Sequence, residues 1–190
     1  MSRIFCIVGK SSTGKDTLYK KIMEEDGARL NAVIPCTTRP MRVNERDGVD
    51  YNFFSIEEME KLEKEGKLIE KREYFTTQGL WVYFTLKFDV EQGKDYILIT
   101  TLEGAKGLIE YYGSDMVHVI YLHADDKVRL LRYIERESKQ PNPDYSEVCR
   151  RFLADAKDFS EENLGIFKNL HPIDASSDID ESFKQWKKIF

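Results

Sequence analysis

The chain has 190 residues, 33% of them charged, and a formal net charge of −5 at pH 7. This length supports one well-buried core rather than two domains. The acidic balance argues against nucleic acid or an anionic membrane as a partner, because both attract basic surfaces. The three cysteines form no Cys-x-x-Cys pair, and we expect Cys6 and Cys149 in the core. The N-terminal apolar run of five residues is too short for a signal peptide or a membrane span, so a cytoplasmic protein is expected.

A phosphate-binding loop lies close to the N-terminus. The apolar run 4–8 predicts a strand buried on both faces, and the spacing glycine, four residues, Gly-Lys follows it directly. A helix comes next, with Leu18 and Ile22 on one face and Gly27 as its stop. This context is typical of loops whose backbone N–H groups and lysine hold phosphates. The residues expected around the phosphates are Gly9, Ser11, Ser12, Thr13, Gly14, Lys15, Asp16 and Thr17.

Asp16 departs from the usual loop pattern, in which a Ser or Thr hydroxyl at this place ligates magnesium. A carboxylate among phosphates is repulsive unless a cation lies between them. We therefore expect Asp16 to be a Mg²⁺ ligand, with Thr17 supplying a hydroxyl. The alternative is that Asp16 only stabilises the N-terminus of the helix through its dipole.

The next segment predicts a small mixed unit. A short strand over 30–34 ends at a proline and leads into a charged loop over 36–50 with three arginines. A strand-like run over 51–54 precedes a helix that begins with the capping box Ser55 and Glu58. The stretches 68–75 and 80–84 predict two strands joined by a hairpin at 76–79, hence a small antiparallel sheet. A short helical piece ending at Gly93 follows.

A second alternation of elements predicts the central sheet. The runs 96–99, 103–112 and 117–122 read as strand, helix and strand, which is typical of a parallel sheet with helices on both faces. Ligands of such a sheet bind outside the carboxyl ends of its strands, where the phosphate loop begins. A last strand is expected within 166–174, and a helix from Asp178 carries an apolar stripe for packing.

Two arginine-bearing helices are expected between the strand 117–122 and the last strand within 166–174. Asp125 caps the first helix, which runs to about Ser138 with Val128, Leu131 and Ile134 facing inward. The prolines within 139–144 cannot continue it, and Ser146 starts the second helix. The pair suggests a mobile lid.

A second motif follows the phosphate loop at a defined distance. Its residues are Thr37-Thr38-Arg39, Arg42, Glu45, Gly48, Asp50-Tyr51-Asn52-Phe53 and Ser55. Together with the loop, this motif resembles the guanylate kinase family over nearly the whole chain. The resemblance implies a three-layer α/β fold of the P-loop nucleoside monophosphate kinases, with a central parallel sheet, a small mixed acceptor-binding subdomain and a helical lid. It implies a single domain with a core over 1–34, 94–134 and 152–190, an acceptor-binding subdomain over 35–93 and a lid over 135–151.

The resemblance also implies roles for individual residues. ATP and Mg²⁺ would be bound at the phosphate loop, and a nucleotide would be the acceptor. Arginines and tyrosines can bind the phosphate of the acceptor, because guanidinium groups pair bidentately with phosphate oxygens and a phenol donates to a remaining one. The acceptor-binding residues would be Arg39, Arg42, Tyr51, Glu70, Tyr83, Thr85 and Thr101. The catalytic residues would be Lys15, Arg132, Arg136 and Arg151. Arg129 and Arg150 are expected to be surface charges.

The sequence leaves several alternatives for the identity of the acceptor. GMP or dGMP is the best expectation, with Glu70 reading guanine, but Pro35, Ile99 and Thr101 stand where the family has base- or metal-contacting side chains. The Gly-Lys-Asp loop also resembles ribose 1,5-bisphosphokinases, which would make a sugar phosphate the acceptor. A third reading is a non-catalytic guanylate-kinase-like binding module. We expect nucleotide substrates, no nucleic acid, no membrane, and a monomer or homodimer.

Overall fold

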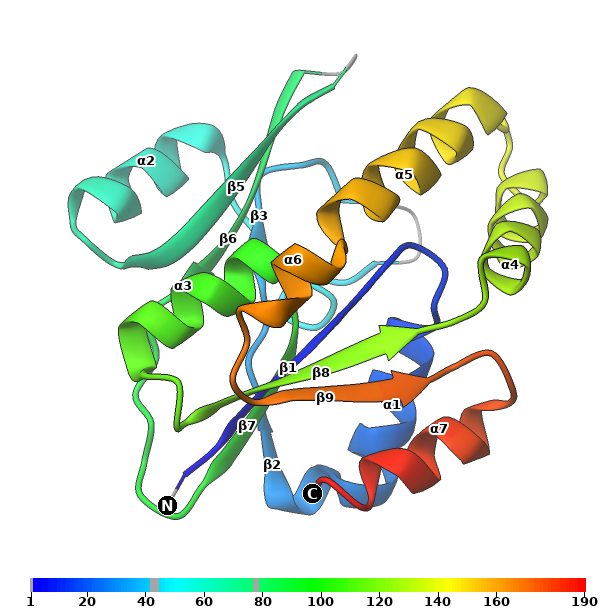
Figure 1. Ribbon diagram of the computed structural model, residues 1–190. Coiled ribbons are helices and arrows are strands. Elements are labelled where there is room, and N and C mark those ends of the chain that lie inside the picture. Colours follow the sequence, from blue (N-terminus) through cyan, green and yellow to red (C-terminus); the bar gives the residue numbers. More distant parts are fainter. Residues whose placement is uncertain (1, 42–44, 77–78) are drawn as a thin grey trace.

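The computed structural model describes residues 2–41, 45–76 and 79–190 (Figure 1). A five-stranded sheet of order β2-β7-β1-β8-β9 lies at its centre, and all of its neighbouring strands pair in parallel. The strands are β1 (Ile4–Gly9), β2 (Leu30–Ala32), β7 (Asp95–Ile99), β8 (Val117–His123) and β9 (Leu170–Asp174). The predicted α/β class with a central parallel sheet is confirmed.

Helices cover both faces of this sheet. The side chains of β1 alternate between the faces and are fully buried, as expected for a central parallel strand. On one face they pack with α3 (Leu102–Tyr112) and α6 (Glu161–Gly165). On the other face they pack with α1 (Lys15–Asp26) and α7 (Ile179–Trp186). Leu18 and Ile22 of α1 are buried as predicted, and a short 3₁₀ turn, Gly27–Arg29, follows that helix.

A second sheet of order β4-β3-β6-β5 is inserted between β2 and β7 and projects from the central sheet in Figure 1. Its strands are β3 (Cys36–Thr37), β4 (Asn52–Phe53), β5 (Leu68–Thr76) and β6 (Gly79–Leu86). Helix α2 (Ile56–Lys64) begins with the predicted capping box, in which Ser55 and Glu58 each accept a backbone N–H. Met59 of α2 packs on the sheet. The predicted hairpin joins β5 to β6, and its residues 77–78 lie outside the described part of the chain.

The predicted inward face of α4 (Asp126–Ser138) is wrong. Leu131 and Ile134 are 59% and 42% exposed, whereas Arg129 and Tyr133 are buried. The helix packs against α5 (Tyr145–Asp158) and the phosphate loop rather than on the sheet, so a polar face is turned inward. Cys149 of α5 is likewise exposed, not part of the core.

Two smaller expectations also fail. The stretch 87–93 is not helical, and α6 was not expected, because five residues are too few to display a helical period. The C-terminal expectation is confirmed, since Asp178 caps α7 and Trp186 of that helix is buried.

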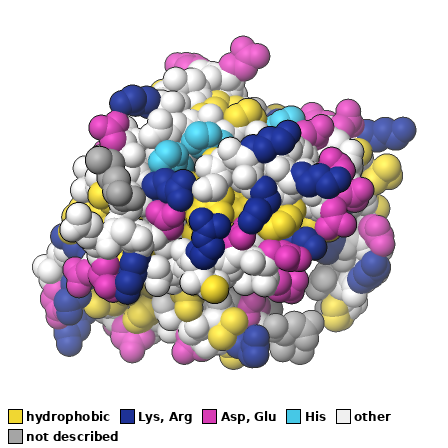
Figure 2. All heavy atoms as spheres, turned by 90° about the horizontal axis from the view of Figure 1, so that it is seen from below, with side chains coloured by type: hydrophobic (Ala, Val, Ile, Leu, Met, Phe, Trp, Pro, Cys, Tyr) yellow, Lys and Arg dark blue, Asp and Glu magenta, His cyan; other side chains and the backbone are white. Residues whose placement is uncertain are grey.

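None of the helices in the described ranges is long and apolar enough to cross a membrane. Figure 2 shows Lys and Arg side chains intermixed with Asp and Glu on the face seen from below. Histidine side chains are also visible on that face.

Two histidines on neighbouring strands should make the stability depend on pH. His118 of β8 and His171 of β9 stack with ring centroids 5.3 Å apart and Nδ1 3.1 Å from Nε2. Burial lowers the pKa of both rings, and for His118 the neighbouring His171 and Arg3 lower it further while Asp95 opposes them. The folded protein therefore binds fewer protons than the unfolded chain. We expect the free energy of unfolding to fall as the pH drops below about 6.5.

The pair can be tested by urea unfolding between pH 8 and pH 5. The variant His171→Gln should show a smaller loss of unfolding free energy over that range than the wild type. His123→Gln is the matched control, since His123 lies on the same sheet but not in this pair. An identical pH dependence in the wild type and in His171→Gln would contradict the assignment.

Candidate active site

The phosphate loop joins the end of β1 to the start of α1. Gly9 is required where the loop leaves the sheet, since a Cβ there would collide with the carbonyl oxygen of Leu122 on β8. Gly14 adopts φ 95° and caps α1 without any side-chain hydrogen bond. The first N–H groups of a helix have no partner within the helix. This helix terminus therefore offers N–H groups and a positive dipole end to an anion.

Lys15 is already directed into the loop. Its Nζ donates to the carbonyl oxygens of Gly9 at 2.8 Å and Lys10 at 3.1 Å. Burial lowers the pKa of Lys15 to about 8. Asp16 and Asp155 oppose this effect, whereas Arg151 and Arg136 add to it. A phosphate bound in the loop would be a counter-charge for this ammonium group and would raise its pKa again.

The second sheet presents a buried arginine with two tyrosines. The side chain of Arg39 is 3% exposed, and its terminal nitrogens donate to both carboxylate oxygens of Glu45 at 2.7 and 2.6 Å. Its Nε donates to the hydroxyl of Tyr83 at 3.1 Å, and its guanidinium carbon lies 4.9 Å from the ring centroid of Tyr51. Burial raises the pKa of Tyr51 to about 12, so its hydroxyl stays a donor. Arg42, the other predicted arginine of this group, lies outside the described residues.

Glu70 belongs to β5, and its side chain lies between Thr85 of β6 and Gly107 of α3. Its Oε1 accepts a hydrogen bond from the hydroxyl of Thr85 at 2.6 Å, and burial raises the pKa of its carboxyl group. A Cβ on Gly107 of α3 would come within 2.6 Å of the Cβ of Glu70, so only glycine allows this approach. Thr101 caps α3, and its hydroxyl accepts from the N–H of Gly104 at 3.0 Å. The structure thus brings these three predicted residues to one end of α3.

The three arginines predicted to be catalytic occupy two different places. Arg132 donates to the carbonyl oxygens of Ala175 at 2.9 Å and Ser177 at 3.2 Å, and lines a cavity of about 100 Å³ that borders the phosphate loop at Thr13, Gly14 and Thr17. Arg136 and Arg151 are exposed and flank one ring, with guanidinium carbons 4.5 and 5.9 Å from the centroid of Tyr133.

Two further groups near the loop were missed. Arg129, expected on the surface, is 1% exposed and contacts Asp155 and the backbone of Ser11, so that expectation is wrong. Its position four residues before Tyr133, on the same helical face, was the available signal. Nothing in the sequence pointed to Asp155.

Arg72 of β5 links three segments. Its guanidinium pairs with Glu103 of α3 at 2.7 Å and with Asp158 of α5 at 3.0 Å. The second sheet is thereby tied to α3, a helix that covers one face of the central sheet, and to α5.

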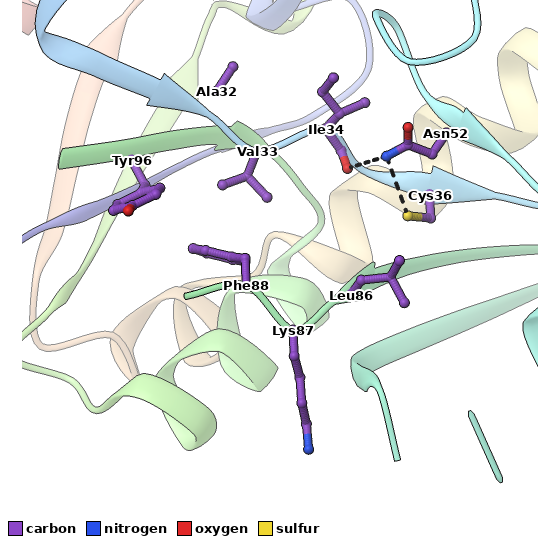
Figure 3. A pocket seen from close by; sticks show the side chains of 9 residues that line it. All are labelled: Ala32, Val33, Ile34, Cys36, Asn52, Leu86, Lys87, Phe88 and Tyr96. Carbon is purple, nitrogen blue, oxygen red and sulfur yellow. Dashed lines mark hydrogen bonds between the residues drawn. The ribbon is translucent and has the colours of Figure 1, made fainter. Parts of the chain in front are cut away.

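A larger cavity of about 310 Å³ lies elsewhere, where the chain passes between the two sheets (Figure 3). Mostly apolar side chains line it, namely Ala32, Val33, Ile34, Cys36, Leu86, Phe88 and Tyr96, together with Asn52 and Lys87. The ammonium of Lys87 points away from the hollow. The amide of Asn52 donates to the carbonyl oxygen of Ile34 at 3.3 Å. The lining includes none of the predicted site residues, so cavity size does not locate the chemistry.

The fold is that of an α/β protein with a glycine-lysine loop after its first strand and a second, smaller sheet. Comparisons with known proteins identify its family. The model of the guanylate kinase family matches residues 1–187. The guanylate kinase of Zymomonas mobilis is 27% identical over 190 residues, which cover 98% of this chain and 82% of that protein. The guanylate kinase of Symbiobacterium thermophilum is 32% identical over 166 residues, or 85% and 73% of the two chains.

A solved structure agrees in fold. The crystal structure of guanylate kinase from Anaplasma phagocytophilum superposes with a TM-score of 0.68 at 21% identity, over 99% of this chain and 84% of that one. At this identity the likeness concerns the fold alone. The family model matches nearly the full length of this chain, so the chain belongs to the guanylate kinase family, a family of nucleoside monophosphate kinases.

Proposed function

We propose that this protein transfers a phosphoryl group from ATP to GMP or dGMP. One observation carries the proposal: a buried arginine bonded to a tyrosine, and a half-buried glutamate, belong to the small second sheet and the segment that follows its strand β3. Arg39 and Tyr83 form the first group, and Glu70 is the second. Asp16 of the loop is close enough to Tyr51 to raise the pKa of its hydroxyl, although burial has the larger effect. These groups would suit two phosphates and one base.

The acceptor would be held at both of its ends. We assign its phosphate to Arg39, Tyr51 and Tyr83, together with Arg42, because guanidinium groups and phenols donate to phosphate oxygens. We assign the base to Glu70, Thr85 and Thr101. A carboxylate accepts from the two adjacent N–H groups of guanine, and adenine does not offer this pair of donors.

On the ATP side of the site, the protein would act by placing positive charges around the donor phosphates. Phosphoryl transfer needs positioning and positive charge near the equatorial oxygens rather than a covalent nucleophile. Lys15 would neutralise the donor phosphates, and the exposed Arg136 and Arg151 are free to approach the transferred group. Arg132 would bind the donor from the cavity beside the loop. In this scheme residues 35–93 act as the acceptor-binding subdomain, 135–151 as the lid and the remainder as the core.

Magnesium is the metal that fits this donor set. Mg²⁺ commonly binds one or two protein carboxylates and otherwise takes oxygens from substrate phosphates and water. Asp16 and Thr17 offer a carboxylate and a hydroxyl at the start of α1. When bound, the ion would supply positive charge close to the donor phosphates.

Asp16→Asn should raise the Mg²⁺ concentration needed for half-maximal turnover by about 10-fold, because it removes the ligand's charge and keeps its shape. The measurement is a magnesium titration at saturating nucleotides, with the exposed Glu24→Gln on the same helix as control. Equal magnesium dependence in wild type and Asp16→Asn would rule out the metal role and leave only the effect on the helix dipole.

The proposed reaction is tested by a coupled ADP-release screen over all ribo- and deoxynucleoside monophosphates and ribose 1,5-bisphosphate. We expect turnover with GMP and dGMP and none after Lys15→Ala. Turnover of the sugar phosphate alone would support the bisphosphokinase, which the comparisons do not favour. No turnover with any acceptor would support the binding module. We further propose a cytoplasmic monomer or homodimer with nucleotides as its partners.

A further inference from the structure

An ion pair between α4 and α5 contacts the phosphate loop at a single residue. The carboxylate of Asp155 accepts a hydrogen bond from the backbone N–H of Ser11, with 2.6 Å between N and Oδ2. The Nε of Arg129 donates to the carbonyl oxygen of the same residue at 3.2 Å. The two side chains contact each other at 2.9 Å. One ion pair therefore holds both backbone groups of Ser11.

The burial of this pair needs a reason. The side chains of Arg129 and Asp155 are 1% and 15% exposed. Arg129 also pairs with Asp126 at 2.5 Å and lies over the ring of Phe152, so its guanidinium is fully engaged. A buried ion pair is weak evidence for stability, because apolar residues of similar size often replace it without loss. Apolar residues could fill this space between the helices, but they could not hydrogen-bond the loop.

The loop has a local need for such a clamp. Ser12, the residue after Ser11, has φ 61°, and no other non-glycine residue in the described ranges has a positive φ. A strained backbone of this kind persists only where its surroundings enforce it. The loop has no glycine between Gly9 and Gly14 that could adopt the conformation without strain. Fixing the peptide groups of Ser11 restrains the chain directly before the strained residue.

We propose that Arg129 and Asp155 are positioning residues that hold the phosphate loop in its binding conformation and couple it to α4 and α5. The proposal rests on the proposed function only in taking ATP as the ligand of the loop. Because the two side chains come from different helices, a movement of either helix alters the hydrogen bonds to Ser11. Binding of the donor is thereby linked to the position of the two helices that flank residues 139–144.

The first test removes both charges together, so that neither is left buried alone. The variant Arg129→Met/Asp155→Leu should raise the KM for ATP about 10-fold or more. The KM for GMP and the Tm should stay close to wild type. The matched control, Glu147→Leu/Arg150→Met, removes an exposed ion pair from α5 that does not touch the loop, and should leave both KM values unchanged. A folded double variant with an ATP KM within about twofold of wild type would overturn the proposal.

The second test needs no enzyme activity and covers the case in which the double variant does not fold. Asp155→Asn keeps the shape of the side chain and removes its charge. We expect the amide of Ser11 to exchange with solvent deuterium about 10-fold faster than in the wild type, without ATP, because its acceptor is weaker. Unchanged exchange would overturn the clamp. A lower KM for ATP would also overturn it, since the carboxylate would then be a competitor of the phosphates. A wild type that does not use ATP would refute the proposed function and leave the exchange result decisive for the clamp.

Discussion

Lys15→Met is expected to lower kcat for GMP phosphorylation about 10³-fold while the protein stays folded. The ammonium of Lys15 already points into the loop, where it donates to two backbone carbonyl oxygens. A group placed in advance stabilises the charge of the transition state without reorganising. Methionine has a similar length and no charge, so the loss reports on that charge.

The same substitution should not destabilise the protein without nucleotide. The pKa of Lys15, about 8 in the folded state, lies below that of an unfolded lysine. The charged side chain therefore opposes folding at every pH below about 8, and this cost is lost as the pH rises toward the unfolded pKa. At pH 7 the Tm of Lys15→Met should be at least that of the wild type. Lys20→Met, on the exposed side of α1, is the control. Turnover within tenfold of wild type would contradict the role of Lys15.

Glu70→Gln should lower kcat/KM for GMP by about 10²- to 10³-fold and reduce the preference for GMP over AMP. A carboxylate accepts hydrogen bonds from both guanine N–H groups. A glutamine side chain has only one acceptor oxygen, so its NH₂ group would face the second N–H group of guanine. The fold should persist, because the hydroxyl of Thr85 can donate to the glutamine oxygen as it does to Oε1 of Glu70. The exposed Glu73→Gln on the same strand is the matched control.

Glu70 should also shape the pH profile. Burial raises the pKa of its carboxyl group, so protonation begins at a higher pH than for an ordinary glutamate. A protonated carboxyl group loses one acceptor, and kcat/KM for GMP should fall on that acidic limb. The limb should be absent from the profile of Glu70→Gln. A GMP preference unaffected by the substitution would show that other residues read the base.

The sequence predicted best what depends on near neighbours. The strand, the phosphate loop and α1 are contiguous, and so are the capping box of α2 and the cap of α7. Each of these is decided by hydrogen bonds and apolar spacing within a few residues. The parallel pairing of the central sheet followed from the strand-helix alternation, whereas the order of its strands was not predicted.

What the sequence did not predict depends on distant contacts. The apolar residues of α4 suggested that Leu131 faces the core, but the helix packs on α5 and on the loop, so Arg129 takes the buried side. The space for Glu70 is set by Gly107 on another element. Neither contact leaves a periodic signal near the residue concerned, and α6 is too short to leave one.

The ties made by Arg72 have a consequence for how readily the second sheet moves. The three partners, Arg72, Glu103 and Asp158, are 25%, 48% and 33% exposed, so water and dissolved ions reach them. Each such ion pair contributes about 0–1 kcal/mol, comparable with thermal energy, and salt weakens it further. The two ion pairs therefore favour the observed arrangement of the second sheet only weakly. Raising the ionic strength of the solution should therefore weaken the tie between the second sheet, α3 and α5.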